Sequence, residues 1–190
     1  MSKENYLGLA DVQLWKLLRE GDRSALDEVY RRNIDILYSY GAKITSDSAL
    51  VEDSIQEIFI TIWEKKDKLK DTTSIKFYLF KSLKRRIFRN LKKSQKFGFQ
   101  YDFSEAKLAD KLKTEPATEA LDDATIKKIH QSLAQLTNRQ KEIVYLRFYA
   151  KLDFSEVAEI MELSIKATYK LQARAIQRLK ENFILSFMFF

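Results

Sequence analysis

Cysteine is absent from this 190-residue sequence, and histidine occurs only once. The absence of cysteine excludes disulfides, thiolate catalysis and cysteine-ligated zinc, and a single histidine cannot form a histidine cluster around a metal. Proline also occurs once, and glycine four times. This shortage of turn-forming residues disfavours a β-sandwich, a barrel or a nucleotide-binding α/β fold, and it favours long helices.

Long apolar runs are missing as well. The longest run, residues 183–190, falls far short of the roughly 20 apolar residues that span a bilayer. Residues 1–9 are too polar for a secretory signal. We therefore expect a cytoplasmic protein without a transmembrane segment. Hydrophobic residues make up 45% of the chain and charged residues 32%, so it can bury a core and stay in solution.

Positive charge is concentrated in two blocks. The formal net charge is +7, yet residues 64–96 alone carry 13 basic and 3 acidic side chains, and residues 164–190 carry 5 and 1. Between them, residues 97–124 carry 3 basic and 7 acidic side chains and include the single proline, Pro116. We interpret residues 97–122 as a linker between two domains, and the basic blocks as surfaces for a polyanion.

Apolar residues recur at helical spacing, and no strand pattern is visible. Before the linker the pattern predicts a short helix that ends at Gly21 and a long helix over residues 26–42, with Tyr30 among the apolar residues that mark it. Two more helices are predicted over residues 51–63 and 77–91. Four such helices form a bundle-like domain.

Four shorter helices are predicted after the linker. Thr137 and Gln140 have the spacing of a capping box, which opens a helix that continues through Phe148. Asp153 or Ser155 can cap the helix that follows. The fold class expected from the whole chain is therefore all-α, with two small helical domains joined by a linker.

The last two predicted helices have the arrangement of a helix-turn-helix. Ser164 can cap the final helix, whose inner face is expected to include Ile165 and Thr168. A stripe of cations at four-residue spacing can neutralise phosphates, and it consists of Lys166, Lys170, Arg174 and Arg178. Ala167 and Tyr169, near the helix start, can reach base edges. Taken alone, such a stripe is equally typical of a solvated helix face.

An acidic cluster over residues 52–57 could be mistaken for a catalytic or metal-binding carboxylate pair. No histidine and no second carboxylate cluster accompanies it in the sequence, and no phosphate-binding loop occurs. We expect no catalytic residue, no metal site and no cofactor. A polar helix face that binds a protein partner fits this segment better.

Three motifs together resemble the extracytoplasmic-function (ECF) sigma factors of bacterial RNA polymerase, which belong to the sigma-70 family. Residues 52–63 read EDSIQEIFITIW and are similar to the family's helix with an Asp-x-x-Gln-Glu-x-Phe-x-x-x-Trp pattern. Residues 136–143 read LTNRQKEI and are similar to its Leu-Pro-x-Arg-Gln-Arg-Glu-Val motif. The third motif is FSEVAEIM, residues 154–161, followed by Leu163, Ser164, Arg174 and Ala175.

The resemblance implies a transcription initiation factor with no enzymatic activity. Residues 1–96 would form a region-2-like domain that docks on core polymerase and melts the −10 element, and residues 97–122 an acidic linker. Residues 123–190 would form a region-4-like domain that binds the −35 element and the polymerase flap. The implied partners are core RNA polymerase, promoter DNA and an anti-sigma factor, with no small-molecule substrate. The implied location is the cytoplasm, in association with the nucleoid.

The resemblance also implies roles for individual side chains. Contacts with the clamp helices of the largest polymerase subunit are expected from Asp53, Gln56, Glu57, Phe59, Ile60 and Trp63. Contacts with the −10 element are expected from Lys66, Lys68, Lys70, Ser74, Tyr78, Lys81, Lys84, Arg85, Arg86 and Arg89. Contacts with the −35 element are expected from Ser164, Lys166, Ala167, Tyr169, Lys170 and Arg174. The loop over residues 65–74 would hold an unpaired base.

Some positions depart from the family pattern. Arg85 and Arg89 stand where the basic helix usually carries Asn and Asp, and Glu162 replaces the glycine of the turn. The preferred promoter sequence therefore stays open. Two other classes also remain: a stand-alone helix-turn-helix regulator that binds duplex operator DNA without polymerase, and a protein-interaction module whose basic faces are merely solvated.

Overall fold

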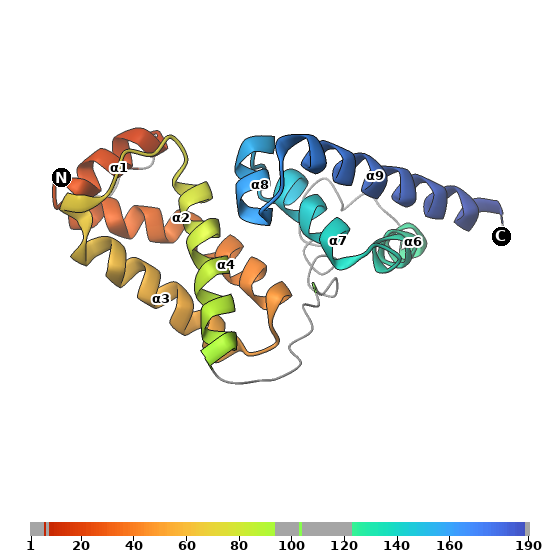
Figure 1. Ribbon diagram of the computed structural model, residues 1–190, viewed down its shortest axis with the longest axis horizontal. Coiled ribbons are helices and arrows are strands. Elements are labelled where there is room, and N and C mark those ends of the chain that lie inside the picture. Colours follow the sequence, from red (N-terminus) through yellow and green to blue (C-terminus); the bar gives the residue numbers. More distant parts are fainter. Residues whose placement is uncertain (1–5, 7, 94–102, 104–122, 189–190) are drawn as a thin grey trace. The chain divides into compact units, whose positions relative to one another are not determined.

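The computed structural model describes residues 6, 8–93, 103 and 123–188, and every regular element within these residues is helical (Figure 1). This confirms the predicted all-α fold class. The chain divides into two compact units, Met1–Phe99 and Gln100–Phe190. The predicted linker lies outside the described residues except for Phe103. None of the described helices combines the length and the apolar character that a membrane span requires.

The first unit contains the four predicted helices: α1 (Asp11–Arg19), α2 (Arg23–Ile44), α3 (Ser48–Glu64) and α4 (Ile75–Lys93). Asp22 and Asp47 cap α2 and α3, because their carboxylates accept hydrogen bonds from backbone N–H groups of the first turn. Gly21 follows α1 with a φ of 92°, a left-handed conformation that glycine adopts without strain.

Helix α2 packs against each of the other three helices of the unit. The aromatic rings of Tyr40 on α2 and Phe80 on α4 are fully buried, with their centroids 4.8 Å apart. Gly41 lets α2 and α3 approach closely, since a Cβ atom there would lie 2.6 Å from a Val51 methyl carbon. The candidate functional residues of this unit lie on α3, on the loop over residues 65–74 and on α4.

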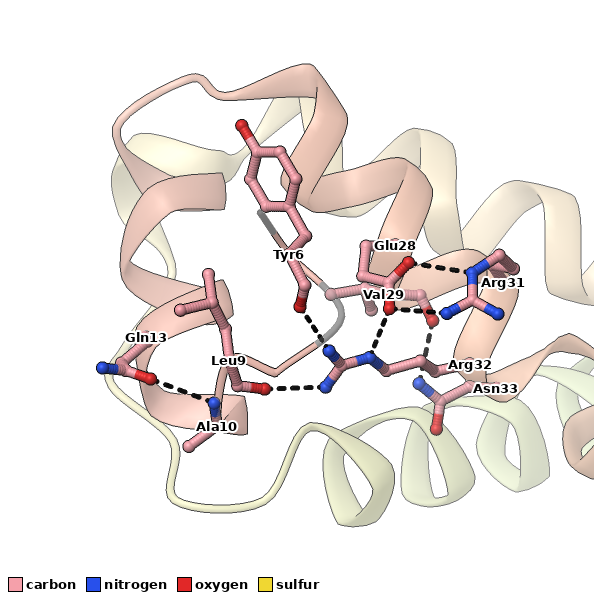
Figure 2. A network of polar contacts seen from close by, with 9 residues as sticks. All are labelled: Tyr6, Leu9, Ala10, Gln13, Glu28, Val29, Arg31, Arg32 and Asn33. Atoms are coloured by element: carbon pink, nitrogen blue, oxygen red, sulfur yellow. Dashed lines mark hydrogen bonds and ion pairs between the residues drawn. The ribbon is translucent and has the colours of Figure 1, made fainter. Parts of the chain in front are cut away.

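A polar network ties the N-terminal segment to α2 (Figure 2). The Arg32 guanidinium donates to the backbone carbonyls of Leu9 at 2.8 Å and of Tyr6 at 2.6 Å. Glu28, only 8% exposed, accepts hydrogen bonds from Arg31 and Arg32. These charge-assisted bonds, above all those from Arg31, hold the pKa of Glu28 at about 2. The network fixes the chain just before α1.

The second unit contains α6 (Asp123–Ala134), α7 (Asn138–Val144), a π-helical turn η3 (Tyr145–Tyr149), α8 (Phe154–Met161) and α9 (Ile165–Met188). The predicted capping box is present, because Thr137 and Gln140 each accept a hydrogen bond from the other's backbone N–H. Asp153 caps α8, as one of the two predicted alternatives. Hydrogen bonds from the Glu156 amide and Ser155 lower the pKa of this carboxyl.

The helical segment that begins at Asn138 runs through Phe148 as predicted, because α7 continues after Val144 as the π-helical turn, in which the Phe148 side chain is 55% exposed. One expectation for this unit was wrong. Ile165 was placed on the inner face of the last helix, but it lies in the first turn of α9 and is 51% exposed. Thr168 is on the inner face as predicted, and is fully buried.

Phe103 packs in the core of the second unit although it belongs to the predicted linker. Its side chain is 1% exposed, and its ring meets that of Tyr145 edge to face, with centroids 5.9 Å apart. Phe103 therefore belongs to the packed core of the second unit, although the sequence placed it in the linker.

Candidate functional site

The exposed face of α3 carries most of the residues expected to bind polymerase. Asp53, Gln56 and Ile60 are exposed, and Ile60 is 55% exposed despite its apolar side chain. Phe59 differs, because it is 7% exposed and its ring packs edge to face against Tyr30 of α2 at 5.0 Å. Phe59 therefore supports this surface from the core rather than presenting its own ring.

Tyr30 extends the apolar part of this surface onto α2. It is 42% exposed, although the sequence pattern counted it among the apolar residues of its helix. Tyr30 contacts Phe59, the residue that precedes exposed Ile60, and large exposed apolar side chains of this kind are typical of a protein-binding surface. Periodicity could not assign Tyr30 to this surface, because its spacing also fits the buried face of α2.

Two further side chains predicted to contact polymerase, those of Glu57 and Trp63, contact other residues of the first unit. Glu57 forms an ion pair with Arg86 of α4. The ring of Trp63 is partly exposed, and the Lys66 ammonium lies over it at 4.8 Å from the centroid. Trp63 and Lys66 thus join the end of α3 to the start of the following loop.

The loop over residues 65–74 contains one short 3₁₀ turn, η2 (Lys66–Lys68). Lys68 and Lys70 are exposed, while Ser74 is half-buried and acts as a cap. The Ser74 hydroxyl accepts a hydrogen bond from the Phe77 backbone N–H at 3.1 Å, at the start of α4. The predicted −10 residues of this loop therefore include two exposed cations, Lys68 and Lys70, and one hydroxyl, that of Ser74, which caps α4.

Helix α4 follows the loop in the chain and carries the other cations of the predicted −10 set. Arg85 and Arg89 are exposed one helical turn apart, whereas Lys81 and Lys84 are half-buried, each with its ammonium near an aromatic ring. Arg86 also faces α3, where it donates to Thr61 Oγ1 at 3.3 Å in addition to pairing with Glu57. Of the predicted arginines, Arg85 and Arg89 are thus presented most openly.

Tyr78, one of the expected −10 contacts, is half-buried. Its ring packs against that of Trp15 on α1, with centroids 5.1 Å apart and an interplanar angle of 58°. Burial raises the pKa of its hydroxyl. The structure places Tyr78 at the junction of α1, the loop and α4, so any base contact it makes depends on α1.

In the second unit, α8 and α9 are joined by a turn that begins with Glu162 in the left-handed region, at φ 55° and ψ 49°. Ser164 caps α9, since its hydroxyl accepts from the Ala167 backbone N–H at 3.2 Å. The side chains that follow on the outer face are exposed, namely Lys166, Tyr169, Lys170 and Arg174, while Ala167 is half-buried. All of the predicted −35 residues therefore lie at the cap or within the first three turns of one helix.

The Tyr169 ring is supported from α8. It is 53% exposed and stacks on Phe154, with centroids 3.7 Å apart and planes 24° apart. The Arg147 guanidinium lies 4.1 Å from the centroid of the Phe154 ring. Arg147 is itself held by Gln172 and by the carbonyl of Leu152. This aromatic stack between α8 and α9 had no signature in the sequence, because its members are far apart along the chain.

Among the side chains that the structure describes, no group of three His, Asp or Glu residues could hold a metal ion. The surfaces described above are instead built from exposed cations, aromatic rings and one acidic helix face. Such surfaces bind polyanions and protein partners.

Comparison with known families assigns both units. The model "Sigma-70 region 2" matches residues 29–97, and the model "Sigma-70, region 4" matches residues 132–181. Together the two models cover more than half of the chain, in the order that the motifs predicted. The chain therefore belongs to the sigma-70 family, which confirms the resemblance seen in its sequence. Helix α1 precedes the first matched residue.

Two solved structures share the fold. CnrH, solved in complex with the cytosolic domain of CnrY, is 19% identical with a TM-score of 0.57, over 91% of this chain and 96% of that chain. The sigma factor RpoE from Bartonella quintana, solved with the anti-sigma factor NepR, is 20% identical with a TM-score of 0.56. That match covers 82% of this chain and 94% of RpoE. The search of curated proteins found no match.

Proposed function

We propose that this protein is an ECF-type sigma factor, which binds core RNA polymerase and directs it to specific promoters. The observation that carries the proposal is the match of both sigma regions, in order, to two separate helical units. Its role is to initiate transcription by binding, with no catalytic step of its own. It acts in the cytoplasm, at the nucleoid, where polymerase and chromosome are found.

Docking on the clamp helices of the largest polymerase subunit is assigned to the exposed face of α3. Asp53 and Gln56 supply polar contacts there, and Ile60 with Tyr30 supplies the apolar centre. Phe59 contributes by holding the Tyr30 ring in place. The region-4-like domain, residues 123–190, makes the second contact, with the polymerase flap.

Recognition of the −10 element is assigned to the loop over residues 65–74 and to α4. A sigma factor opens DNA without a nucleotide of its own, so it must hold unpaired bases and the strand backbone. Lys68 and Lys70 on the loop and Arg85 and Arg89 on α4 offer exposed cations for the phosphates. Residues 1–96 would thus combine polymerase docking with −10 melting.

Recognition of the −35 element is assigned to α9 as the recognition helix of a helix-turn-helix. Lys166, Lys170 and Arg174 are exposed for the phosphates, and the supported ring of Tyr169 is presented to base edges in the major groove. The linker, residues 97–122, would connect this domain to the first through the polymerase.

An anti-sigma factor is the third proposed partner. Both structural neighbours were solved in complexes, one with the anti-sigma factor NepR and one with the cytosolic domain of CnrY. Such a partner would cover the polymerase-docking and DNA-binding faces until a signal releases the sigma factor.

The proposal is tested by gel filtration of the protein with core polymerase, followed by binding of the complex to promoter fragments in increasing salt. The proposal is supported if the protein co-elutes with polymerase and if the complex, but not the free protein, binds promoters in a sequence-specific manner. Tight sequence-specific binding by the free protein without co-elution supports a stand-alone helix-turn-helix regulator instead. No nucleic-acid binding at any salt, with or without polymerase, supports a protein-interaction module.

A further inference from the structure

Helix α1 binds the backbone of the loop over residues 65–74. The indole Nε1–H of Trp15 donates to the carbonyl of Lys70 at 2.9 Å, across 55 residues of sequence. Trp15 is 2% exposed and Lys70 is exposed, so this part-buried hydrogen bond joins a core side chain to the surface loop. In the next residue of the loop, the Asp71 carboxylate forms an ion pair with Arg19 of the same helix.

The same helix also sets the start of α4. The Asp11 carboxylate accepts a hydrogen bond from the Ile75 backbone N–H at 3.0 Å, and so caps α4 from another helix. The Trp15 ring packs on Tyr78, one turn further along α4. Contacts from α1 therefore reach the loop at residues 70 and 71 and α4 at residues 75 and 78.

These contacts restrict a segment with little regular structure of its own. Between the end of η2 at Lys68 and the start of α4 at Ile75, the described hydrogen bonds within the loop are that of the Leu69 N–H with the Lys66 carbonyl, which closes η2, and those of Thr72 with Ser74. A hydrogen bond to a backbone carbonyl fixes the direction of the chain at that peptide, whichever side chain the loop carries there. The path of the loop is thus set largely by α1, which lies before the region matched by the sigma-70 region 2 model.

We propose that α1 determines which base of the −10 element the loop accepts, with Trp15 as the positioning residue. This inference rests on the proposed function, in which the loop takes in an unpaired base. Trp15 is buried and does not contact DNA; it acts through the Lys70 peptide and the Tyr78 ring. A small movement of these groups changes the contacts that the captured base makes, and so changes the preference among the four bases.

The test compares Trp15→Phe with an isosteric replacement of Trp15 by benzothienylalanine, in which sulfur replaces the ring N–H. The second variant removes the donor while it keeps the size of the ring, so it separates the hydrogen bond from packing. Val12→Ala is the matched control, because Val12 lies on the same helix with its side chain 55% exposed. The full-length variants are combined with core polymerase, and transcription is measured from promoters that carry each of the four bases at every −10 position.

The expected result is a loss of base preference at one −10 position by roughly threefold to tenfold in both Trp15 variants, as for one hydrogen bond removed. Amide hydrogen exchange of residues 69–75 rises in parallel, while polymerase affinity and the −35 preference stay at the wild-type values. The inference is overturned if the benzothienylalanine variant folds and the amide hydrogens of its loop exchange faster, yet its base preference is that of the wild type. If the wild-type protein neither binds core polymerase nor supports specific transcription, the proposed function itself is overturned.

Discussion

Glu57 of α3 and Arg86 of α4 form an ion pair that joins the proposed polymerase-docking helix to the proposed −10 helix. The Arg86 side chain is 21% exposed and also donates to Thr61 Oγ1. Two side chains that the sequence assigned to different partners are therefore bonded to each other. Arg86 therefore orients α4 against α3, and the proposed phosphate contacts are its more exposed neighbours Arg85 and Arg89.

This arrangement predicts different effects for two arginines of α4. Arg89→Gln removes an exposed cation, so it should lower promoter affinity and reduce the slope of log affinity against log salt by about one. Arg86→Gln should leave that slope unchanged, because its charge is already paired with Glu57. The measurement is a salt titration of promoter binding by the reconstituted polymerase complex. A reduced slope in Arg86→Gln would contradict the assignment.

A second prediction concerns docking on polymerase. Ile60→Ala and Tyr30→Ala should each weaken core binding by about 1–2 kcal/mol, since both remove exposed apolar contacts at the centre of the surface. The measurement is the affinity for fluorescently labelled core polymerase. Val12→Ala, an exposed apolar residue on α1, is the control and should bind as the wild type does. Equal losses in all three variants would exclude a specific docking surface.

A third prediction concerns the recognition helix. Lys170→Gln should weaken binding to all −35 sequences alike and reduce the salt slope by about one, whereas Tyr169→Ala should change the sequence preference. Lys180→Gln serves as the control, because Lys180 is an exposed cation of α9 off the basic stripe. Binding is measured with the complete polymerase complex on a −35 library. Unchanged preference in Tyr169→Ala would exclude Tyr169 from base recognition.

The contacts of α1 and α3 show where sequence reasoning reached its limit. Helical spacing located the four helices of the first unit, and the Thr137–Gln140 spacing located the capping box, because these signals are local. The exposure of Tyr30 and Ile165 was missed, since periodicity identifies an apolar face but not whether another helix covers it. The bond between Trp15 and the Lys70 carbonyl has no sequence signature, because any residue supplies a carbonyl.

A fourth prediction follows from the buried carboxylate of Glu28. Its pKa is lowered from 4.5 to about 2, so its contribution to stability is fully present above pH 4.5 and is lost as the pH falls towards 2. Glu28→Gln should therefore destabilise the first unit by about 1–3 kcal/mol at pH 7, and by progressively less below pH 4.5. Both tryptophans, Trp15 and Trp63, lie in this unit, so their fluorescence during urea unfolding reports its stability.

The matched control for this change is Asp27→Asn, at the neighbouring exposed position of α2. It should have a small effect at every pH. A difference between Glu28→Gln and the wild type that stays constant from pH 7 to pH 2 would contradict the lowered pKa.

A fifth prediction concerns the turn before the recognition helix. Glu162 adopts a left-handed conformation that costs a non-glycine residue about 1 kcal/mol, so Glu162→Gly should stabilise the second unit by about that amount. Amide exchange of the most protected residues of α8 and α9 should slow by roughly fivefold. Glu162→Ala removes the same carboxylate but keeps the strain, and should give no gain. Equal stabilisation by both variants would show that charge, rather than backbone conformation, is responsible.

The most direct test of the sigma-factor assignment is run-off transcription with purified core polymerase on genomic promoter fragments, with and without this protein. The account predicts discrete transcripts that appear only when the protein is added. The Ile60→Ala and Lys170→Gln variants should both give weaker transcripts. Absence of any added transcript, together with failure to bind core polymerase, would contradict it.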